Sequence, residues 1–507
     1  MTFPRSSGIL LHPTSLPGPD GIGDFGPAAY RFLDFLQASG VNLWQVLPLN
    51  PTGYGDSPFQ CFSASAGNPL LISLERLADQ GVLDAADIKF SSPGPADQVD
   101  YQSVIEFKFP LLEKAAKQFL TSAAAADRRR FQGFCQANAD WLDNFALFMA
   151  IKGSHGNVAW THWPQPLSSR APDALSEAQQ GLAQAIERIK YWQFEFFQQW
   201  QDLRTYARER GVRIIGDIPI YIAHDSADVW ANRELFWLDE KGNPEKIAGV
   251  PPDYFSATGQ CWGNPIYNWE LLKKTGYRWW IARFRSALRL YDIARIDHFR
   301  GFEAYWEVPG NATTAVNGKW VKGPGADLFN VLQTEFHELP IIAENLGVIT
   351  PEVEALRRQF GFPGMAILQF AFGNDPQAHT FRPHNYVRDL VVYTGTHDND
   401  TVEGWWASKG TDDSIRTPED VAKEHAYARA YLGFNDEPIH QVLVREVLSS
   451  VANTAIIPLQ DILGLGREAR MNLPGTSRGN WKWRCLPNAL TPTLAASLRR
   501  LVELYER

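Results

Sequence analysis

The sequence has 507 residues, 45% of them hydrophobic and 21% charged, and 48 Lys and Arg against 57 Asp and Glu give a formal net charge of −9. So much apolar mass supports a large folded core and excludes a disordered chain. The acidic balance argues against nucleic acid or a membrane as a partner, because both attract clustered positive charge.

The cysteines and the N-terminus bear on the compartment. The four cysteines are far apart and form no C-x-x-C pair, which favours a reducing compartment and argues against a disulfide framework or a zinc site. The first residues contain no apolar core of the signal-peptide kind, and no apolar run approaches the about 18 residues of a membrane span. We therefore expect a cytoplasmic protein.

Eight short apolar runs bounded by turn residues predict β-strands. Several are apolar on both faces, which is typical of parallel strands that helices cover. Between them lie helical patterns that end at glycine, as at Gly40 and Gly211. Eight parallel strands joined by helices predict an α/β fold, a (β/α)8 TIM barrel with mostly helical insertions between strands. The predicted strands are 8–12, 42–49, 212–222, 293–299, 340–347, 365–372, 390–399 and 454–463.

We expect one catalytic barrel to span residues 1–507. The gap between the second and third strands, about 160 residues, is too long for a single crossover. It predicts a largely helical inserted subdomain at about 60–205. Smaller insertions are expected at about 223–290 and about 400–450, the second of them helical.

Acidic residues follow several of the predicted strands. Arg295 and Asp297 stand two apart at the end of the fourth strand, so their side chains point to the same face. An arginine beside a carboxylate favours its ionised form, the state that a nucleophile needs. Glu344 comes directly after the apolar run of the fifth strand, where burial raises a carboxyl pKa and keeps a proton available for general acid catalysis.

Three more polar residues belong to this set. His397 and Asp398 stand at the end of the seventh strand, and Asp217 lies in the third. Each acid alone is compatible with a helix cap or a structural ion pair. Together they would meet at the carboxyl ends of barrel strands, where such folds build their active sites. Two carboxyl groups in opposed environments predict chemistry on a glycosidic bond.

Long blocks of the sequence resemble the amylomaltases, the 4-α-glucanotransferases or disproportionating enzymes of the α-amylase clan. The resemblance runs from about residue 6 to residue 484. The blocks are RSSGILLHPTSLPGPDGIGDFG, PLNPTGYGDSPFQ, GDIPIYIAHDSADVW, AGVPPDYFSATGQCWGNP, RIDHFRGFEAYW, IIAENLG, THDND and PLQDILGLGREARMNLPG.

The resemblance implies roles for individual residues. It implies that Asp297 is the nucleophile, Glu344 the acid/base and Asp398 a third acid that holds sugar hydroxyls. Substrate-binding residues are implied near these acids and in a loop that covers the glucan and shapes the acceptor side. They are Tyr54, Asp217, Asp253, Tyr254, Phe255, Gln260, Trp262, Asn264, Arg295, His397 and Asn472.

The sequence departs from its relatives in two places. The block that begins at Asp217 reads Asp-Ile-Pro-Ile-Tyr-Ile where an ordinary amylase would end in Asn-His, which favours the transferase branch. Phe59 stands where the family often has Tyr, so a hydroxyl contact is in question there.

The resemblance implies retaining transfer of an α-1,4-glucan segment from a donor maltooligosaccharide to the 4-hydroxyl of glucose or another maltooligosaccharide. We expect no cofactor and no metal, because the motif residues include no set of metal ligands at recognisable spacing, and we expect a monomer or weak homo-oligomer. Three alternatives stay open: a glucan hydrolase with the same carboxylates, a non-catalytic glucan-binding protein, and a metal-dependent sugar isomerase that would use His397, Asp398 and Glu344 as ligands.

Overall fold

The computed structural model describes residues 3–90, 94–252, 258–410, 416–476 and 478–507. At its centre is a sheet of eight parallel strands in the order β10-β11-β12-β1-β2-β3-β6-β9. The Ala343 N–H donates to the Pro363 carbonyl oxygen over 2.9 Å and joins the two end strands, so the sheet closes into a barrel. The strands are β1 (Ser6–Leu10), β2 (Leu43–Gln45), β3 (Arg213–Pro219), β6 (Ile293–Asp297), β9 (Ile341–Ala343), β10 (Gly364–Ile367), β11 (Leu390–Tyr393) and β12 (Thr454–Pro458).

Apolar side chains cover both faces of the barrel strands. One set fills the barrel interior and includes at least one residue from every strand, such as Leu10, Ile215 and Ile456. Alternate residues, such as Ile9 and Ile214, face outward and pack under the helices. This double burial explains why the strands read as continuous apolar runs, and it confirms the predicted (β/α)8 barrel.

All eight predicted strands are present, but every one of them ends earlier than predicted. The sixth stops at Ile367 and continues as the 3-10 helix η7 (Leu368–Ala371). The eighth stops at Pro458 and continues as α17 (Leu459–Leu463). These segments are still apolar because the chain stays buried as it turns across the end of the barrel, so hydropathy alone does not show where the strand stops.

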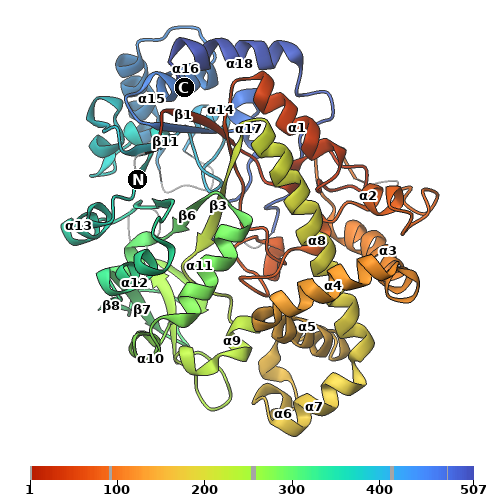
Figure 1. The fold of residues 1–507 in the computed structure, drawn as a ribbon. Helices are drawn as coiled ribbons and strands as arrows, with labels where there is room; N and C mark the ends of the chain where they lie inside the picture. The colour runs from red at the N-terminus through yellow and green to blue at the C-terminus, as the bar shows by residue number, and fades with distance from the viewer. Residues whose placement is uncertain (1–2, 91–93, 253–257, 411–415, 477) are drawn as a thin grey trace.

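The long connection between β2 and β3 forms a helical layer beside the barrel (Figure 1). Its last helix, α8 (Ala183–Glu209), contacts α3, α4, α5 and α7 of that layer and also α1 and β3 of the barrel. One continuous helix therefore joins the inserted helices to the barrel wall. The other helices here are α2 (Leu74–Asp79), α3 (Tyr101–Ser122), α4 (Ala125–Ala137), α5 (Ala139–Ser154), α6 (Gln165–Ser168) and α7 (Pro172–Gly181).

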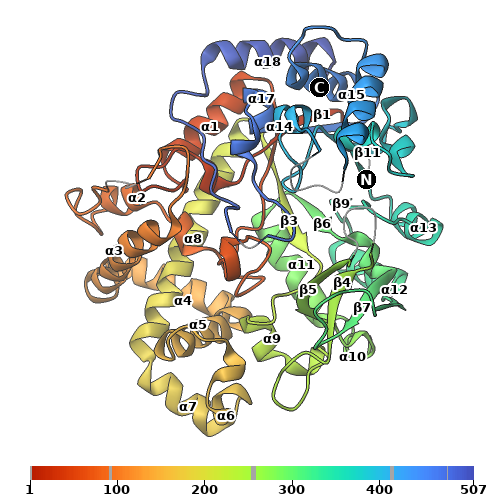
Figure 2. The ribbon, with the colours of Figure 1, turned by 180° about the vertical axis from the view of Figure 1, so that it is seen from behind.

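A second sheet lies at the end of β6 and was not predicted (Figure 2). It is antiparallel, in the order β5-β4-β7-β8. Its strands are β4 (Lys246–Val250), β5 (Gln260–Pro265), β7 (Ala304–Pro309) and β8 (Lys319–Lys322). They come from two separate connections, after β3 and after β6, so the insertions are not only helical.

The remaining helices cover the barrel, and α18 packs against α1. Among the described residues, none of the helices is both long and apolar enough to cross a membrane. These helices are α1 (Pro27–Ala38), α9 (Ala227–Ala231), α10 (Trp269–Lys274), α11 (Arg278–Leu290), α12 (Ala326–Phe336), α13 (Pro351–Gln359), α14 (Val402–Ala407), α15 (Pro418–Leu432), α16 (Ile439–Ser449) and α18 (Pro492–Leu504).

Candidate active site

Arg295 links two of the acids predicted from sequence. Its Nη1 lies 3.0 Å from Oδ1 of Asp297 and 2.6 Å from Oδ2 of Asp217. The register of β3 and β6 sets Asp217 beside Arg295, and Asp297 ends β6 two residues later on the same face. One guanidinium thus holds two carboxyl groups at the carboxyl end of the barrel; the two-residue spacing predicted the common face of Arg295 and Asp297, but not the pairing with Asp217.

Burial shapes the charges of this group. Burial raises the pKa of Asp217 to about 7 against the attraction of Arg295, and its Oδ1 is buried with no hydrogen-bond partner. Burial also acts to lower the pKa of Arg295, but Asp217, Asp297 and Glu344 outweigh it and the pKa is raised. Arg295 therefore stays positively charged among carboxyl groups.

Glu344 directly follows β9 and is 8% exposed. Its Oε1 accepts a hydrogen bond from the Leu346 N–H at 2.6 Å, and its Oε2 accepts one from the His298 N–H at 2.7 Å. Burial and then the charge of Asp297 raise its pKa to about 7, while Arg295 and the two backbone donors act against the rise. The carboxyl group can hold a proton near neutral pH, as its position after an apolar strand predicted.

His298 is part of the site and was missed by sequence reasoning. Its backbone angles are left-handed, φ 53° and ψ 48°. The residue lies between the end of β6 and the start of η6 (Phe299–Phe302). Burial lowers its pKa to about 4, so the imidazole is neutral, and its Nε2 is buried without a hydrogen-bond partner. The available signal was its place directly after Asp297.

A second cluster surrounds Asp398. Nε2 of His397 lies 3.4 Å from Oδ1 of Asp398, and Nδ2 of Asn472 donates to the same oxygen at 2.7 Å. Arg470 donates to the Asp398 carbonyl oxygen at 2.7 Å. The Asp398 side chain is 49% exposed. Burial lowers the pKa of His397, and Asp398 acts against it, as Asp297 does more weakly. Because the charge of Asp297, from the first cluster, acts on His397, the two clusters lie close together.

Phe59 packs on this second cluster. Its ring stacks on His397 with centroids 4.6 Å apart and planes at 23°, and Trp481 lies 6.0 Å from each ring. The position in which the family often has Tyr thus contributes an aromatic face to the cluster. Arg470 and Trp481 come from the far end of the chain and were not predicted, although Arg470 lies in a block of the family resemblance, two residues before Asn472.

The residues expected on the acceptor side are only partly described. Trp262, on β5, meets the His298 ring edge to face at 4.9 Å, so it reaches the end of β6. Gln260 accepts a hydrogen bond from the Trp262 Nε1 at 3.1 Å, and Asn264 is buried in the same strand. Tyr54 begins the 3-10 helix η2 (Tyr54–Asp56), but its side chain lies outside the described part. Asp253, Tyr254 and Phe255 also lie outside the described residues.

Within the described ranges, the structure has no group of three or more His, Cys, Asp or Glu side chains placed to hold a metal ion. The positive charge beside the carboxyl groups of the first cluster is the Arg295 guanidinium.

Known proteins are similar to this chain in both sequence and architecture. The profile of the 4-alpha-glucanotransferase family matches residues 11–490. The chain belongs to the 4-alpha-glucanotransferase family. It is 50% identical to a 4-alpha-glucanotransferase of Thermus thermophilus, with 100% of both chains covered. It is 51% identical to one of Synechocystis sp., with 99% of this chain and 98% of the relative covered.

A solved structure supports the same family. The amylomaltase from Streptococcus agalactiae in complex with acarbose is 42% identical, has a TM-score of 0.94 and covers 99% of both chains. The amylomaltase of Corynebacterium glutamicum shares the fold, with 20% identity and a TM-score of 0.77. The match covers 99% of this chain and 74% of that protein's chain. In this chain, the acids described above lie at the carboxyl ends of the barrel strands of that fold.

Proposed function

We propose that this chain is a retaining 4-alpha-glucanotransferase that acts by double displacement. The observation that carries the proposal is the pair of opposed carboxyl environments at neighbouring strand ends. Asp297 is paired with Arg295 at 3.0 Å, whereas burial raises the pKa of Glu344 to about 7. A nucleophile requires the first environment and a general acid the second.

In the first half of the reaction, Asp297 attacks the anomeric carbon of the donor glucan. Glu344 gives its proton to the leaving glycosidic oxygen, so the bond to that oxygen breaks as the bond to Asp297 forms. The products are a covalent glucosyl-enzyme and a shortened glucan. Two backbone N–H donors fix the Glu344 carboxyl group for this transfer.

In the second half, Glu344 takes the proton from the 4-hydroxyl of an acceptor, glucose or a maltooligosaccharide. The acceptor oxygen displaces Asp297, and the α configuration is restored after two inversions. Asp398 takes no proton in this scheme. Its half-exposed carboxylate, oriented by Asn472, binds sugar hydroxyls on the donor side.

Transfer requires that a sugar competes with water for the glucosyl-enzyme. We assign the acceptor side to β5 and to the 253–264 segment, with Trp262 beside His298 at its described end. An aromatic face that orients the acceptor raises its effective concentration, and well-oriented systems reach about 10⁵ M or more. With water in place of the acceptor, the same carboxylates would give a hydrolase.

Maltotriose separates the two candidates. Incubation with the purified protein, with products resolved by size, should give glucose together with chains longer than three units, and few new reducing ends. A hydrolase would give only shorter sugars and one new reducing end for each cleavage. The Asp297→Asn protein, prepared in the same way, is the control for contaminating activity.

We also propose that the chain works in the cytoplasm as a monomer or weak homo-oligomer. The four cysteines are free, which suits a reducing compartment. Light scattering at several protein concentrations would measure the oligomeric state.

A further inference from the structure

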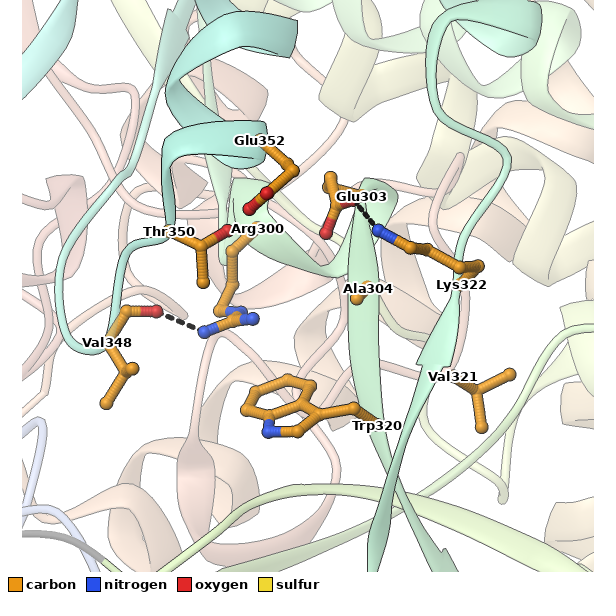
Figure 3. A pocket seen from close by; sticks show the side chains of 9 residues that line it. All are labelled: Arg300, Glu303, Ala304, Trp320, Val321, Lys322, Val348, Thr350 and Glu352. Atoms are coloured by element: carbon orange, nitrogen blue, oxygen red, sulfur yellow. Dashed lines mark hydrogen bonds and ion pairs between the residues drawn. The ribbon is translucent and has the colours of Figure 1, made fainter.

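A pocket of about 230 Å³ lies between the antiparallel sheet and the start of α13 (Figure 3). None of its lining residues belongs to the candidate active site described above. The lining residues are Arg300, Glu303, Ala304, Trp320, Val321, Lys322, Val348, Thr350 and Glu352.

The pocket is formed by the segments that follow both proposed catalytic strands. Arg300 stands three residues after Asp297, and Val348 stands four residues after Glu344. The Arg300 guanidinium donates a hydrogen bond to the Val348 carbonyl oxygen, so the two segments meet in one wall of the pocket (Figure 3). The opposite wall is β8, which contributes Trp320 and Lys322.

Arg300 has hydrogen-bonding capacity that the protein does not use. The residue is only 5% exposed, yet its Nε is buried without a hydrogen-bond partner. Its guanidinium carbon lies 3.8 Å from the centroid of the Trp320 ring, above the indole that borders the pocket. Because this Nε is closed to solvent, it is also closed to a ligand, and what Arg300 offers the pocket is its charged guanidinium group above the indole.

The charges around the pocket balance. Arg300 and Lys322 are cationic, Glu303 and Glu352 are anionic, and Lys322 forms an ion pair with Glu303. Four formal charges that sum to zero favour a neutral ligand over an anion such as phosphate. The same groups, with the Thr350 hydroxyl, offer both donors and acceptors of hydrogen bonds.

The apolar part of the pocket is unusually accessible. Trp320 is 41% exposed and Val348 is 51% exposed. Trp306 packs against Trp320 with centroids 5.1 Å apart and fixes its orientation. A rigid indole edge beside mixed donors and acceptors suits a molecule with an apolar face and a hydroxyl rim. The volume is below the about 300–1,000 Å³ of pockets for larger ligands, so it fits a single ring.

We propose that this pocket binds one neutral sugar ring of a glucan chain, at a site separate from the catalytic cleft. The ligand class follows from the pocket itself. The choice of a glucose polymer as the sugar rests on the proposed function. A long glucan bound here would be held next to the active site, whereas a short oligosaccharide in the cleft would not need the pocket.

The test compares Trp320→Ala with Trp237→Ala. Trp237 is a matched control because it is 36% exposed and has the Lys246 ammonium 4.5 Å above its ring, but it does not line the pocket. Binding to glycogen is measured by retardation in native gels over a range of glycogen concentrations. The kcat and KM for maltotriose are measured on the same preparations.

Trp320→Ala should weaken glycogen binding by about two- to tenfold, the range for loss of one aromatic contact, with kcat and KM for maltotriose unchanged. Trp237→Ala should change neither quantity. Lys322→Met, at a side chain that is 74% exposed, should also weaken glycogen binding.

The proposal would be overturned if glycogen retarded both Trp320→Ala and Lys322→Met as strongly as it retards the wild type. It would also be overturned if the KM for maltotriose rose in step with the loss of glycogen binding. The absence of any glycogen binding by the wild-type protein would overturn it as well. Failure of the proposed transferase function would appear separately, as maltotriose that gives no longer chains.

Discussion

The backbone N–H of His298 donates a hydrogen bond to Oε2 of Glu344 over 2.7 Å. This bond joins the residue after the proposed nucleophile to the proposed acid/base, across the neighbouring strands β6 and β9. The backbone of His298 is left-handed, which costs a residue other than glycine roughly 1–2 kcal/mol. The strained residue therefore positions the carboxyl group through the main chain.

We predict that His298→Gly is more stable than His298→Ala. Both variants lack the imidazole, but only glycine adopts a positive φ without strain, so the difference should be about 1 kcal/mol in favour of glycine. Denaturant unfolding of the two proteins measures it. A stability of His298→Ala equal to or above that of His298→Gly would show that the backbone angle is not the constraint.

The raised pKa of Glu344 predicts how rate depends on pH. The acid must hold its proton in the first step, so kcat/KM for maltotriose should fall as pH rises through about 7. Because the charges of Asp297 and Arg295 act on Glu344, the apparent pKa of this profile belongs to the three residues together. A profile that is flat from pH 6 to pH 9 would remove Glu344 as the acid.

The same pKa predicts a stability difference. A folded-state pKa raised from 4.5 to about 7 gives stability that is fully present below 4.5 and lost as pH rises through 7, up to about 3 kcal/mol. Glu344→Gln should therefore gain stability relative to the wild type between pH 5 and pH 9. Glu209→Gln, at the exposed end of α8, is the control and should show no such gain.

The barrel and its acids could be predicted because their signals are local. Each barrel strand is buried on both faces, so it appears as an apolar run even when it is only three residues long, as in β9. Asp297 and Glu344 stand directly at strand ends, where a parallel barrel must bring side chains together.

The antiparallel sheet could not be predicted in the same way. β8, Lys319–Lys322, has no buried residue, and β4 pairs with β7 from a separate connection about 60 residues away. Likewise, apolar periodicity near Arg470 and Trp481 does not indicate that the chain returns to Asp398 and His397, and only the family resemblance placed the neighbouring Asn472 there. These features depend on contacts between distant segments, which apolar periodicity does not record.

We predict that treatment with EDTA leaves activity intact. The carboxyl groups of the first cluster already face a cation of the protein, since Arg295 lies within 3.0 Å of both Asp217 and Asp297. Activity on maltotriose before and after dialysis against EDTA is the measurement. Loss of activity that one added divalent ion restores would favour the metal-dependent isomerase.

Arg295→Met should destabilise the protein as well as inactivate it. It leaves Asp217 buried without its cation, and breaking a buried pair costs about 3–5 kcal/mol. The double variant Arg295→Met/Asp217→Asn should recover most of the stability, because the fully buried charge of Asp217 is gone and only the partly exposed Asp297 lacks its cation, but it should recover none of the activity. Thermal unfolding and maltotriose turnover separate the two effects, and a double variant no more stable than Arg295→Met would contradict the pairing argument.

The last prediction assigns the two steps to the two carboxyl groups. Asp297→Asn should abolish turnover of every donor, because an amide of nearly the same shape cannot attack the anomeric carbon. Glu344→Gln should slow maltotriose cleavage by about 10²–10⁴-fold, the usual contribution of a general acid. With α-glucosyl fluoride, whose leaving group needs no proton, Glu344→Gln should release fluoride in a burst and then stall, because deprotonation of the acceptor also uses Glu344. Both variants should unfold in a single cooperative transition, which would exclude misfolding as the cause. A fluoride burst from Asp297→Asn, or none from Glu344→Gln, would mean that the roles are assigned to the wrong residues.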